Sequence, residues 1–481
     1  MKITVFSVRA ATLGVACLLA CSLAVAVSPA GAEVPDPIVT GPIPTNAPPG
    51  DPSHDYPQLA TALDLASLGY VEEEYFFSGT ANVYNTPPLT TATIVSSGHP
   101  YESRLIVRRP TSPEKFNGTV LVEWANVSSG FCNDGMFQRS QDHLLRAGYA
   151  YVGVCAQRVG VHGPVGLSNW SPHRYAGLDL SDHGTILDDE LSGDIFSQAA
   201  QAIRSPVGVD IMGGLLTVSR IIAIGESQSQ GYLVIYHNSI HPLANVFDGY
   251  VLYLSTGLGL GGKLRTDLRV KVFKVDSESD LLILGEVAAR QPDSDHLRTY
   301  EVAGASHVAF AGFDLAQMLR TRDGLPLLTP PELCTIQQAL SHVPAFHVLN
   351  AVYDHLSRWV TDGTPPPPAP LVDVVSEGPP VVLKRTPLGL ATGGIQLSQQ
   401  AVPTAVENGI NSGPVPFSPC LLYGSHTPFN AATLARLYPS HGAYVSAVSH
   451  VSHDNVEAGY ILQEDAQTDI VDAAHSSVGH Q

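Results

Sequence analysis

A serine lies at the centre of a cluster of small residues near the middle of the chain. Residues 220–224 form a mostly β-branched apolar run, residues 225–229 read Gly-Glu-Ser-Gln-Ser, and a helix-like apolar pattern follows. This order predicts a strand, a sharp turn and a helix, with Ser227 held in the turn. Such a turn requires small neighbours two positions on either side, and Gly225 and Ser229 meet that requirement. Ser227 is therefore the candidate nucleophile.

A serine hydroxyl is a poor nucleophile at neutral pH, so it needs an adjacent base, and the base needs an orienting acid. His307 follows a predicted strand at 297–302 through a Gly-Ala-Ser approach, and it is the candidate base. Residues 276–280, Asp-Ser-Glu-Ser-Asp, follow a predicted strand at 270–275 and offer three candidate acids. The serine, the acids and the histidine thus each follow a strand. This is the edge of an open parallel sheet where catalytic groups collect.

The strands themselves are predicted from buried-type apolar runs. A strand at 119–124, a helix at 136–147 and a strand at 149–154 form a βαβ unit, which predicts a parallel sheet covered on both faces. Two antiparallel strands are expected before this unit, at 75–84 and 101–110. Other predicted elements are a helix at 193–217, a strand at 246–254, and helices at 345–361, 430–437 and 464–474.

The chain order of serine, acid and histidine is that of the α/β hydrolases. Residues 70–362 resemble this superfamily. The wider motif set is similar to a poorly characterised family of exported α/β hydrolase domain proteins: it comprises residues 122–126, 225–229, 277–280 and 304–307, with 392–395 and 437–439 beyond. The resemblance implies an α/β fold with a mostly parallel central sheet and helices on both faces. It implies a reaction type, hydrolysis through an activated serine, but not a substrate. Our own interpretation is an exported serine hydrolase that cleaves carboxylic esters through an acyl-enzyme.

The resemblance also ranks the remaining site residues. Its commoner strand-to-acid spacing favours Asp280 as the triad acid, with Glu278 and then Asp276 as alternatives. The oxyanion hole is expected to use the backbone N–H of Gln228, the residue after the nucleophile, and that of Asn126 in the loop after strand 119–124. This chain lacks the His-Gly often found at the second position, so the second donor could shift by one residue.

The N-terminus has the layout of a secretory signal peptide over residues 1–32: a basic start, an apolar run from Ala10 to Val27 and an Ala-Gly-Ala cleavage-like site. A lipoprotein anchored through Cys21 is the alternative. The formal net charge of −19 disfavours nucleic acid and anionic membranes as partners. We expect an exported protein with no membrane span in its mature chain; the sequence leaves the oligomeric state open.

Four cysteines remain after this processing and allow three disulfide connectivities. Cys132 follows one predicted strand and Cys155 ends the next, so these two could meet at the same sheet edge. A bond between Cys334 and Cys420 would then follow by elimination. Pairing of this kind suits an oxidising, extracytoplasmic compartment.

The expected organisation has three parts after the signal peptide. Residues 33–57 are rich in proline and glycine and read as an extended arm, and residues 58–364 form the hydrolase core. Within the core, residues 156–191 lack long elements and are expected to form a lid, with Trp170 and Tyr175 as candidate pocket residues. Residues 365–481, after a run of prolines, are expected to pack on the core as an accessory region.

Several alternatives stay open at this point. The same triad cleaves amides, lactones and thioesters, and some members of the superfamily are inactive binding proteins. The acidic stretch 182–190 also contains a histidine, but a charged run in a loop is usually solvated. We therefore expect no metal and no cofactor, and a small-molecule ester as substrate.

Overall fold

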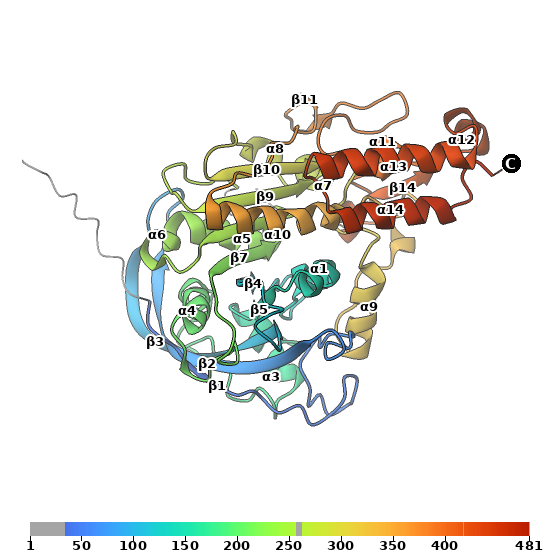
Figure 1. The fold of residues 1–481 in the computed structure, drawn as a ribbon. Helices are drawn as coiled ribbons and strands as arrows, with labels where there is room; N and C mark the ends of the chain where they lie inside the picture. Colours follow the sequence, from blue (N-terminus) through green and yellow to red (C-terminus); the bar gives the residue numbers. More distant parts are fainter. Residues whose placement is uncertain (1–33, 256–261, 417, 481) are drawn as a thin grey trace, which may run out of the picture.

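The computed structural model describes residues 34–255, 262–416 and 418–480. The predicted signal peptide and Cys21 lie outside these residues. The central feature is a ten-stranded sheet with the order β10-β9-β8-β7-β4-β5-β3-β2-β1-β6 (Figure 1). The six strands β10, β9, β8, β7, β4 and β5 run parallel to one another. The next three pairs, β5 with β3, β3 with β2, and β2 with β1, are antiparallel. The sheet is therefore mostly parallel, with an antiparallel side formed by the long, curved β2–β3 hairpin.

The strands of the large sheet are β1 (Ile38–Thr40), β2 (Tyr70–Asn85), β3 (Thr93–Pro110), β4 (Thr119–Trp124), β5 (Ala150–Val154), β6 (Val207–Gly208), β7 (Arg220–Glu226), β8 (Gly249–Tyr253), β9 (Lys271–Ser277) and β10 (Leu297–Val302). Two small antiparallel pairs follow, formed by β11 (Val374–Ser376) with β12 (Val382–Leu383), and β13 (Ala405–Asn408) with β14 (Ser425–Pro428).

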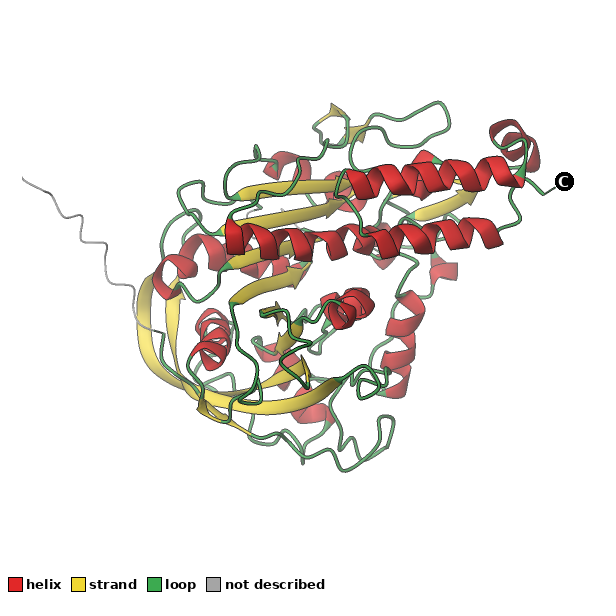
Figure 2. Cartoon of the chain, in the orientation of Figure 1, coloured by secondary structure: helices red, strands yellow, loops and turns green. Residues whose placement is uncertain are grey.

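The helices are α1 (Gly135–Arg146), α2 (Arg158–His162), α3 (Leu167–Trp170), α4 (Ser192–Arg204), α5 (Gln228–Ile235), α6 (His241–Ala244), α7 (Glu278–Ile283), α8 (Glu286–Ala289), α9 (Phe313–Arg322), α10 (Ala345–Asp362), α11 (Ser398–Ala401), α12 (Ala431–Leu437), α13 (His441–Glu457) and α14 (Gln463–His475). Figure 2 shows them on both sides of the sheet.

The central strand β7 illustrates why the sheet is covered twice. Successive side chains of a strand point to opposite faces. Ile221 and Ala223 pack in the cluster that contains residues of α4 and α5, whereas Ile222 and Ile224 pack in the cluster that contains residues of α1 and α10. Because both faces are buried, the strand is a continuous apolar run rather than an alternating one.

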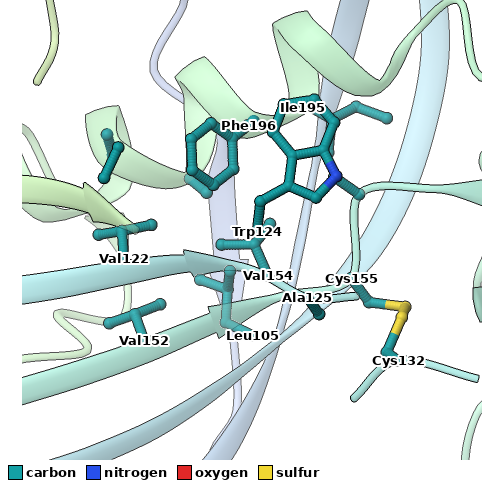
Figure 3. Packing of buried hydrophobic residues seen from close by; sticks show 14 of the residues in the cluster. Leu105, Val122, Trp124, Ala125, Cys132, Val152, Val154, Cys155, Ile195 and Phe196 are labelled. Atoms are coloured by element: carbon teal, nitrogen blue, oxygen red, sulfur yellow. A yellow bond between two sulfur atoms is a disulfide. The ribbon is translucent and has the colours of Figure 1, made fainter. Parts of the chain in front are cut away.

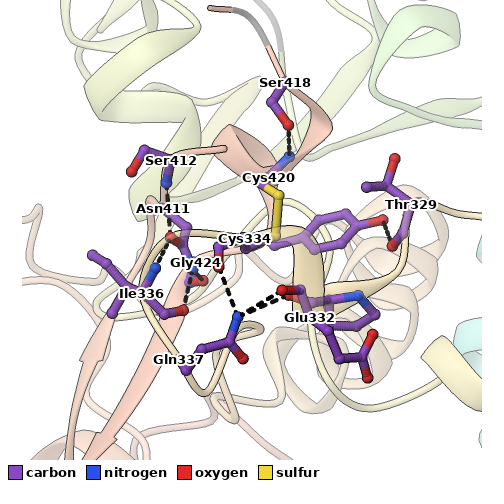
Figure 4. The surroundings of a disulfide bond; sticks show 12 residues. Thr329, Glu332, Cys334, Ile336, Gln337, Asn411, Ser412, Ser418, Cys420 and Gly424 are labelled. Atoms are coloured by element: carbon purple, nitrogen blue, oxygen red, sulfur yellow. Dashed lines mark hydrogen bonds between the residues drawn. A yellow bond between two sulfur atoms is a disulfide. The ribbon is translucent and has the colours of Figure 1, made fainter. Parts of the chain in front are cut away.

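Trp124, at the end of β4, is the largest fully buried side chain of the described residues. Its ring lies beside Phe196 of α4, with the two centroids 4.7 Å apart (Figure 3). The Cys132–Cys155 disulfide joins the loop after β4 to the residue that follows β5, next to this cluster. The second expected disulfide, Cys334–Cys420, is also present and ties the loop after α9 to the C-terminal region (Figure 4).

One helix prediction is wrong in its end point, and two helices of ten or more residues were missed. The helix expected at 193–217 ends at Arg204, because Pro206 lacks an N–H for the helix ladder and Gly208 has a φ of +88°. Helices α9 and α13 were not predicted. Serine, histidine and valine, which have modest helix propensity, dominate α13, so its sequence signal is weak.

The arm and residues 156–191 pack against β2 of the antiparallel side. Glu74 of β2 has a fully buried side chain that forms ion pairs with Arg104 of β3 at 2.9 Å and with Arg174 at 2.7 Å. Tyr175 donates a hydrogen bond to the same carboxylate. Trp170 stacks on His54 of the arm, with ring centroids 4.3 Å apart. These contacts fix the segment as part of the body of the protein.

The C-terminal region, residues 365–480, packs along α10 and the edge of the sheet near β10. In Figure 1, α13 and α14 run beside α10. A bridge between Val302 and Ile395 links β10 to this region, and Asn350 of α10 donates hydrogen bonds to Asp465 of α14. Among the described helices, none combines the length and apolarity required to cross a bilayer.

Candidate active site

The turn between β7 and α5 has the backbone of a strained strand-to-helix elbow. Ser227 has a φ of +56°, a conformation that non-glycine residues rarely adopt. Gly225 is required there, since a Cβ would lie 2.8 Å from Leu233 Cδ1. Ser229 is tolerated in place of glycine because its hydroxyl donates to the Glu226 carbonyl and accepts from the Glu226 N–H. The local contacts thus point the Ser227 side chain out of the turn.

The structure brings Ser227, His307 and Asp280 into one hydrogen-bonded line. His307 Nε2 lies 2.8 Å from Ser227 Oγ, and His307 Nδ1 lies 2.7 Å from Asp280 Oδ1. Asp280 is fully buried, and its other oxygen accepts hydrogen bonds from the backbone N–H and hydroxyl of Ser277, which caps α7. The acid is therefore fixed by its own helix N-terminus and holds one nitrogen of the imidazole while the other faces the serine.

The other two candidate acids do not contact His307. Glu278 forms an ion pair with Arg385 and accepts the backbone N–H of Gly304. Asp276 lies 3.5 Å from Lys274, and burial raises the pKa of Asp276 well above its ordinary value. Asp280 is thus the acid that the geometry places against the imidazole.

The expected oxyanion donors differ in their availability. The N–H of Gln228 opens α5, where the helix ladder does not use it. The backbone N–H of Asn126 donates to the Asn133 carbonyl at 3.0 Å, so it is already occupied. The next donor in this loop is Val127, whose N–H makes a long contact of 3.4 Å with Gln228 Oε1. Asn126 lines the cavity over Ser227 and Val127 does not, so the identity of the second donor stays a prediction.

A cavity of about 380 Å³ opens over Ser227 and His307. Its wall is formed by the loop after β4, the start of α1, α9, the loop 327–329 and residues of the C-terminal region. A larger hollow of about 900 Å³ lies beside α6, near the amino ends of β8 and β9, and contains none of the triad. We take the smaller cavity as the site, because catalytic groups lie at the carboxyl ends of parallel strands.

The segment expected to form the lid, residues 156–191, contributes no residue to the described wall of the catalytic cavity. Trp170 and Tyr175 instead pack against the arm and β2. The cover over the triad comes from α9, with Phe313 and Arg320, and from Leu422 and Tyr423 of the C-terminal region. Sequence analysis missed this contribution because no motif marks these residues.

Charged groups lie directly beside Ser227. Arg139 of α1 contacts Glu226, the residue before Ser227, at 2.8 Å, and both line the cavity. Beneath them, burial raises the pKa of Glu123 well above its ordinary value, which favours the protonated acid. The hydroxyl of Tyr151 donates a hydrogen bond to Glu123. Sequence analysis did not identify this layer.

One group of residues has a donor set that metals accept. His342, Glu407 and His426 offer ligand atoms within 4.8 Å of one another. However, the two imidazole rings are stacked, with centroids 3.9 Å apart and planes 15° apart, so their nitrogens do not converge on one point. Glu407 is also engaged, with His426 Nδ1 at 2.5 Å and with the His342 N–H at 3.0 Å. The absence of a metal from the catalytic site stays a prediction.

Comparisons with solved structures detect distant similarity. A glucuronoyl esterase from Solibacter usitatus is 9% identical, with 56% of this chain and 74% of that chain covered and a TM-score of 0.25. An α/β serine hydrolase without a lid from Xanthomonas campestris is 13% identical, with 52% and 97% covered and a TM-score of 0.28. These values are too low to carry an argument about substrate.

The sequence matches none of the curated proteins. A family model described as an alpha/beta hydrolase domain, in contrast, matches residues 39–470. This range includes the strands of the large sheet from β2 to β10, the residues Ser227, Asp280 and His307, and the accessory region as far as residue 470. The chain therefore belongs to the alpha/beta hydrolase domain family.

Proposed function

We propose that the protein is a serine hydrolase that cleaves carboxylic esters through an acyl-enzyme. The observation that carries this proposal is the line from Ser227 Oγ through His307 to Asp280, with distances of 2.8 Å and 2.7 Å. Within this geometry His307 takes the proton from Ser227 as the hydroxyl attacks the ester carbonyl. Asp280 orients the imidazole and stabilises the imidazolium that forms.

The first half of the reaction forms the acyl-enzyme. Attack by Ser227 Oγ gives a tetrahedral intermediate whose oxyanion is stabilised by the N–H of Gln228 and a second donor at Val127 or Asn126. His307 then gives its proton to the leaving alcohol, and the carbon–oxygen bond of the ester breaks. In the second half, water loses a proton to His307 and attacks the acyl group. His307 then returns this proton to Ser227 Oγ as the bond between the acyl carbon and Oγ breaks, which releases the acid and restores the serine.

The leaving group distinguishes an ester substrate from an amide or a thioester. Amides, lactones and thioesters use the same triad, so the line of three residues does not separate them. We propose an ester over an amide because an alcohol leaves more easily than an amine, and thioesters and lactones stay alternatives. We also propose that the protein is exported, since two buried disulfides suit an oxidising compartment.

The test compares the purified protein with the Ser227→Ala variant on 4-nitrophenyl esters from acetate to octanoate. We expect the variant to lose activity by a factor of about 10⁴ or more, because the nucleophile is removed. A fluorophosphonate probe should label the wild type at Ser227 and leave the variant unlabelled.

Each outcome has a clear reading. Equal turnover by both proteins would contradict the serine mechanism. If both are inert and the probe labels neither, the protein is a binding protein that retains the fold. A thioester and an anilide with the same acyl group, measured in the same assay, rank the alternative leaving groups.

A further inference from the structure

One buried arginine of the described chain differs from the others. Four arginines are nearly inaccessible to solvent: Arg104, Arg108, Arg174 and Arg320. The first three form ion pairs, respectively with Glu74, with Glu72 and Asp134, and with Glu74 and Asp55. Across residues 34–255, 262–416 and 418–480, no carboxylate forms an ion pair with Arg320. The protein has 44 acidic residues against 25 basic ones, so acidic partners are not scarce.

The contacts of Arg320 are all with neutral groups. Its Nη1 donates to the Pro326 carbonyl at 3.0 Å, and its Nη2 donates to the Ser129 hydroxyl at 3.2 Å. The guanidinium lies over the Phe131 ring, 5.1 Å from the centroid. These bonds use two of the five N–H groups of the side chain. Burial lowers the pKa of Arg320, yet a guanidinium remains charged at neutral pH.

Arg320 lines the same cavity as Ser227 and His307. The other charged residues of that wall are Arg139 and Glu226, which form an ion pair with each other. The charges of Arg139, Glu226 and Arg320 in the described wall therefore sum to +1, because the one carboxylate that also acts on Arg320 at longer range, Glu226, is already paired with Arg139. A positive cavity in a chain of net charge −19 is a local feature, not a consequence of composition.

A buried charge without a counter-ion is costly, and the cost falls when an anion enters the cavity. The planar fork of a guanidinium matches a carboxylate with two parallel hydrogen bonds. We propose that Arg320 anchors a carboxylate of the substrate, so that the preferred substrates are esters that carry a separate negative group. The ester part of this statement rests on the proposed function; the binding of a carboxylate does not.

The first experiment compares two 4-nitrophenyl esters with acyl chains of equal length, the anionic glutarate monoester and the neutral valerate. We expect the wild type to prefer the glutarate in kcat/KM by about 10- to 100-fold, the range for a hydrogen bond to a charged group. In Arg320→Gln the ratio should fall to about 1, and Arg320→Lys should retain part of it. Arg436→Gln removes an exposed arginine of α12 and serves as the control that keeps the ratio.

The second experiment places the charge on the alcohol side, with 4-acetoxybenzoate against its neutral methyl ester. A preference that depends on Arg320 in either pair supports the proposal and shows which side of the ester carries the anion. Arg320 could instead only clamp α9 to the loop after β4. In that case Arg320→Gln would lower all rates by the same factor and leave both ratios unchanged, which would overturn the proposal.

The third experiment needs no turnover. Free glutarate should raise the thermal midpoint of the wild type and of Ser227→Ala, but not that of Arg320→Gln. If no ester is cleaved while glutarate still binds through Arg320, the proposed reaction fails and the carboxylate site stands. If glutarate binds wild type and Arg320→Gln equally, the site fails whatever the enzyme does with esters.

Discussion

The antiparallel side of the sheet and the catalytic cavity both bury charged groups, but they do so in opposite ways. On the antiparallel side, Glu74 is surrounded by Arg104, Arg174 and Tyr175, so each charge has its partner within the protein. In the cavity, Arg320 has only neutral hydrogen-bond partners, and Ser227, which is hydrogen-bonded to His307, lines the wall. A closed network of ion pairs holds the fold together, whereas a charge without a counter-ion at a cavity is available to a substrate.

The largest effect that tests this contrast is expected at the triad. Asp280→Asn should lower kcat by about 10⁴, because the amide no longer fixes the imidazole in its reactive form. The fold should survive, since the change keeps the size of the side chain. Steady-state kinetics and a thermal melt on the same preparation check both parts.

Glu278→Gln is the matched control for this prediction. Glu278 lies two residues away and is equally buried, but it binds Arg385 and the Gly304 N–H instead of His307. The control should lose stability and keep most of its activity per folded molecule. If it loses activity as Asp280→Asn does, the assignment of the acid is contradicted.

The second prediction concerns the disulfide beside the cavity, Cys334–Cys420. Cys334–Cys420 closes a span of 86 residues and Cys132–Cys155 one of 23. The loop-entropy model gives about 4–5 kcal/mol for the longer span and about 3 kcal/mol for the shorter. The double substitution Cys334→Ser with Cys420→Ser should therefore lower the free energy of unfolding more than Cys132→Ser with Cys155→Ser does. Urea unfolding of the two variants measures the difference.

The longer disulfide should also affect binding. Leu422 and Tyr423 lie two and three residues after Cys420 and line the cavity. Without the bond this wall is less firmly held, so we expect KM to rise more than kcat falls. An unchanged KM in the folded variant would show that the C-terminal region does not shape the site.

The third prediction concerns the closed network. Glu74→Gln leaves Arg104 with no counter-ion and Arg174 with Asp55 alone, and should cost about 3–5 kcal/mol of stability, as for other broken buried pairs. Glu73→Gln, at the neighbouring position, breaks a partly exposed pair with Arg109 and should cost about 1 kcal/mol or less. Both variants should keep the preference for anionic esters. If Glu74→Gln loses that preference, the antiparallel side and the cavity do not act independently, and the contrast between them is contradicted.

Much of the site could be predicted because its residues follow strands. Ser227, His307 and the acids each stand directly after an apolar run, so local sequence places them at one edge of the sheet. The sequence favoured Asp280 over Glu278 only through the spacing of the family it resembles. In the structure Glu278 is engaged by Arg385, which is 107 residues away in sequence, and local sequence could not predict this contact.

The cavity wall could not be predicted because it also depends on contacts between residues that are distant in sequence. Arg320 meets Ser129 across 191 residues of sequence, and the α9 helix that carries it has no strong amphipathic pattern. Residues 156–191 were expected to cover the site because no strand or long helix fits their sequence; the structure has only the short helices α2 and α3 there. Their aromatic and charged side chains are used instead to fix the arm to β2, a role that depends on contacts distant in sequence.

The prediction with the smallest expected effect concerns a buried carboxyl, Asp469, which we compare with the buried Arg320. Asp469 of α14 is a buried carboxyl whose pKa is raised to about 6 by burial, with hydrogen bonds from Ser398 and Gln399. His347, 3.7 Å away, supplies no positive charge at neutral pH, since burial lowers its pKa to about 4. Between its ordinary pKa and about 6, Asp469 binds a proton more tightly in the folded state, so its contribution to stability declines as pH rises through that range.

Asp469→Asn should therefore stabilise the protein by about 2 kcal/mol at pH 7 and by much less at pH 4.5, where the wild type already holds the proton. Urea unfolding at the two pH values measures the difference, and an equal effect at both would contradict it. The reason bears on Arg320. A buried carboxyl can lose its charge by taking up a proton, whereas a guanidinium cannot lose its own near neutral pH. Only the arginine therefore still requires an anion, and it is the arginine that faces the catalytic cavity.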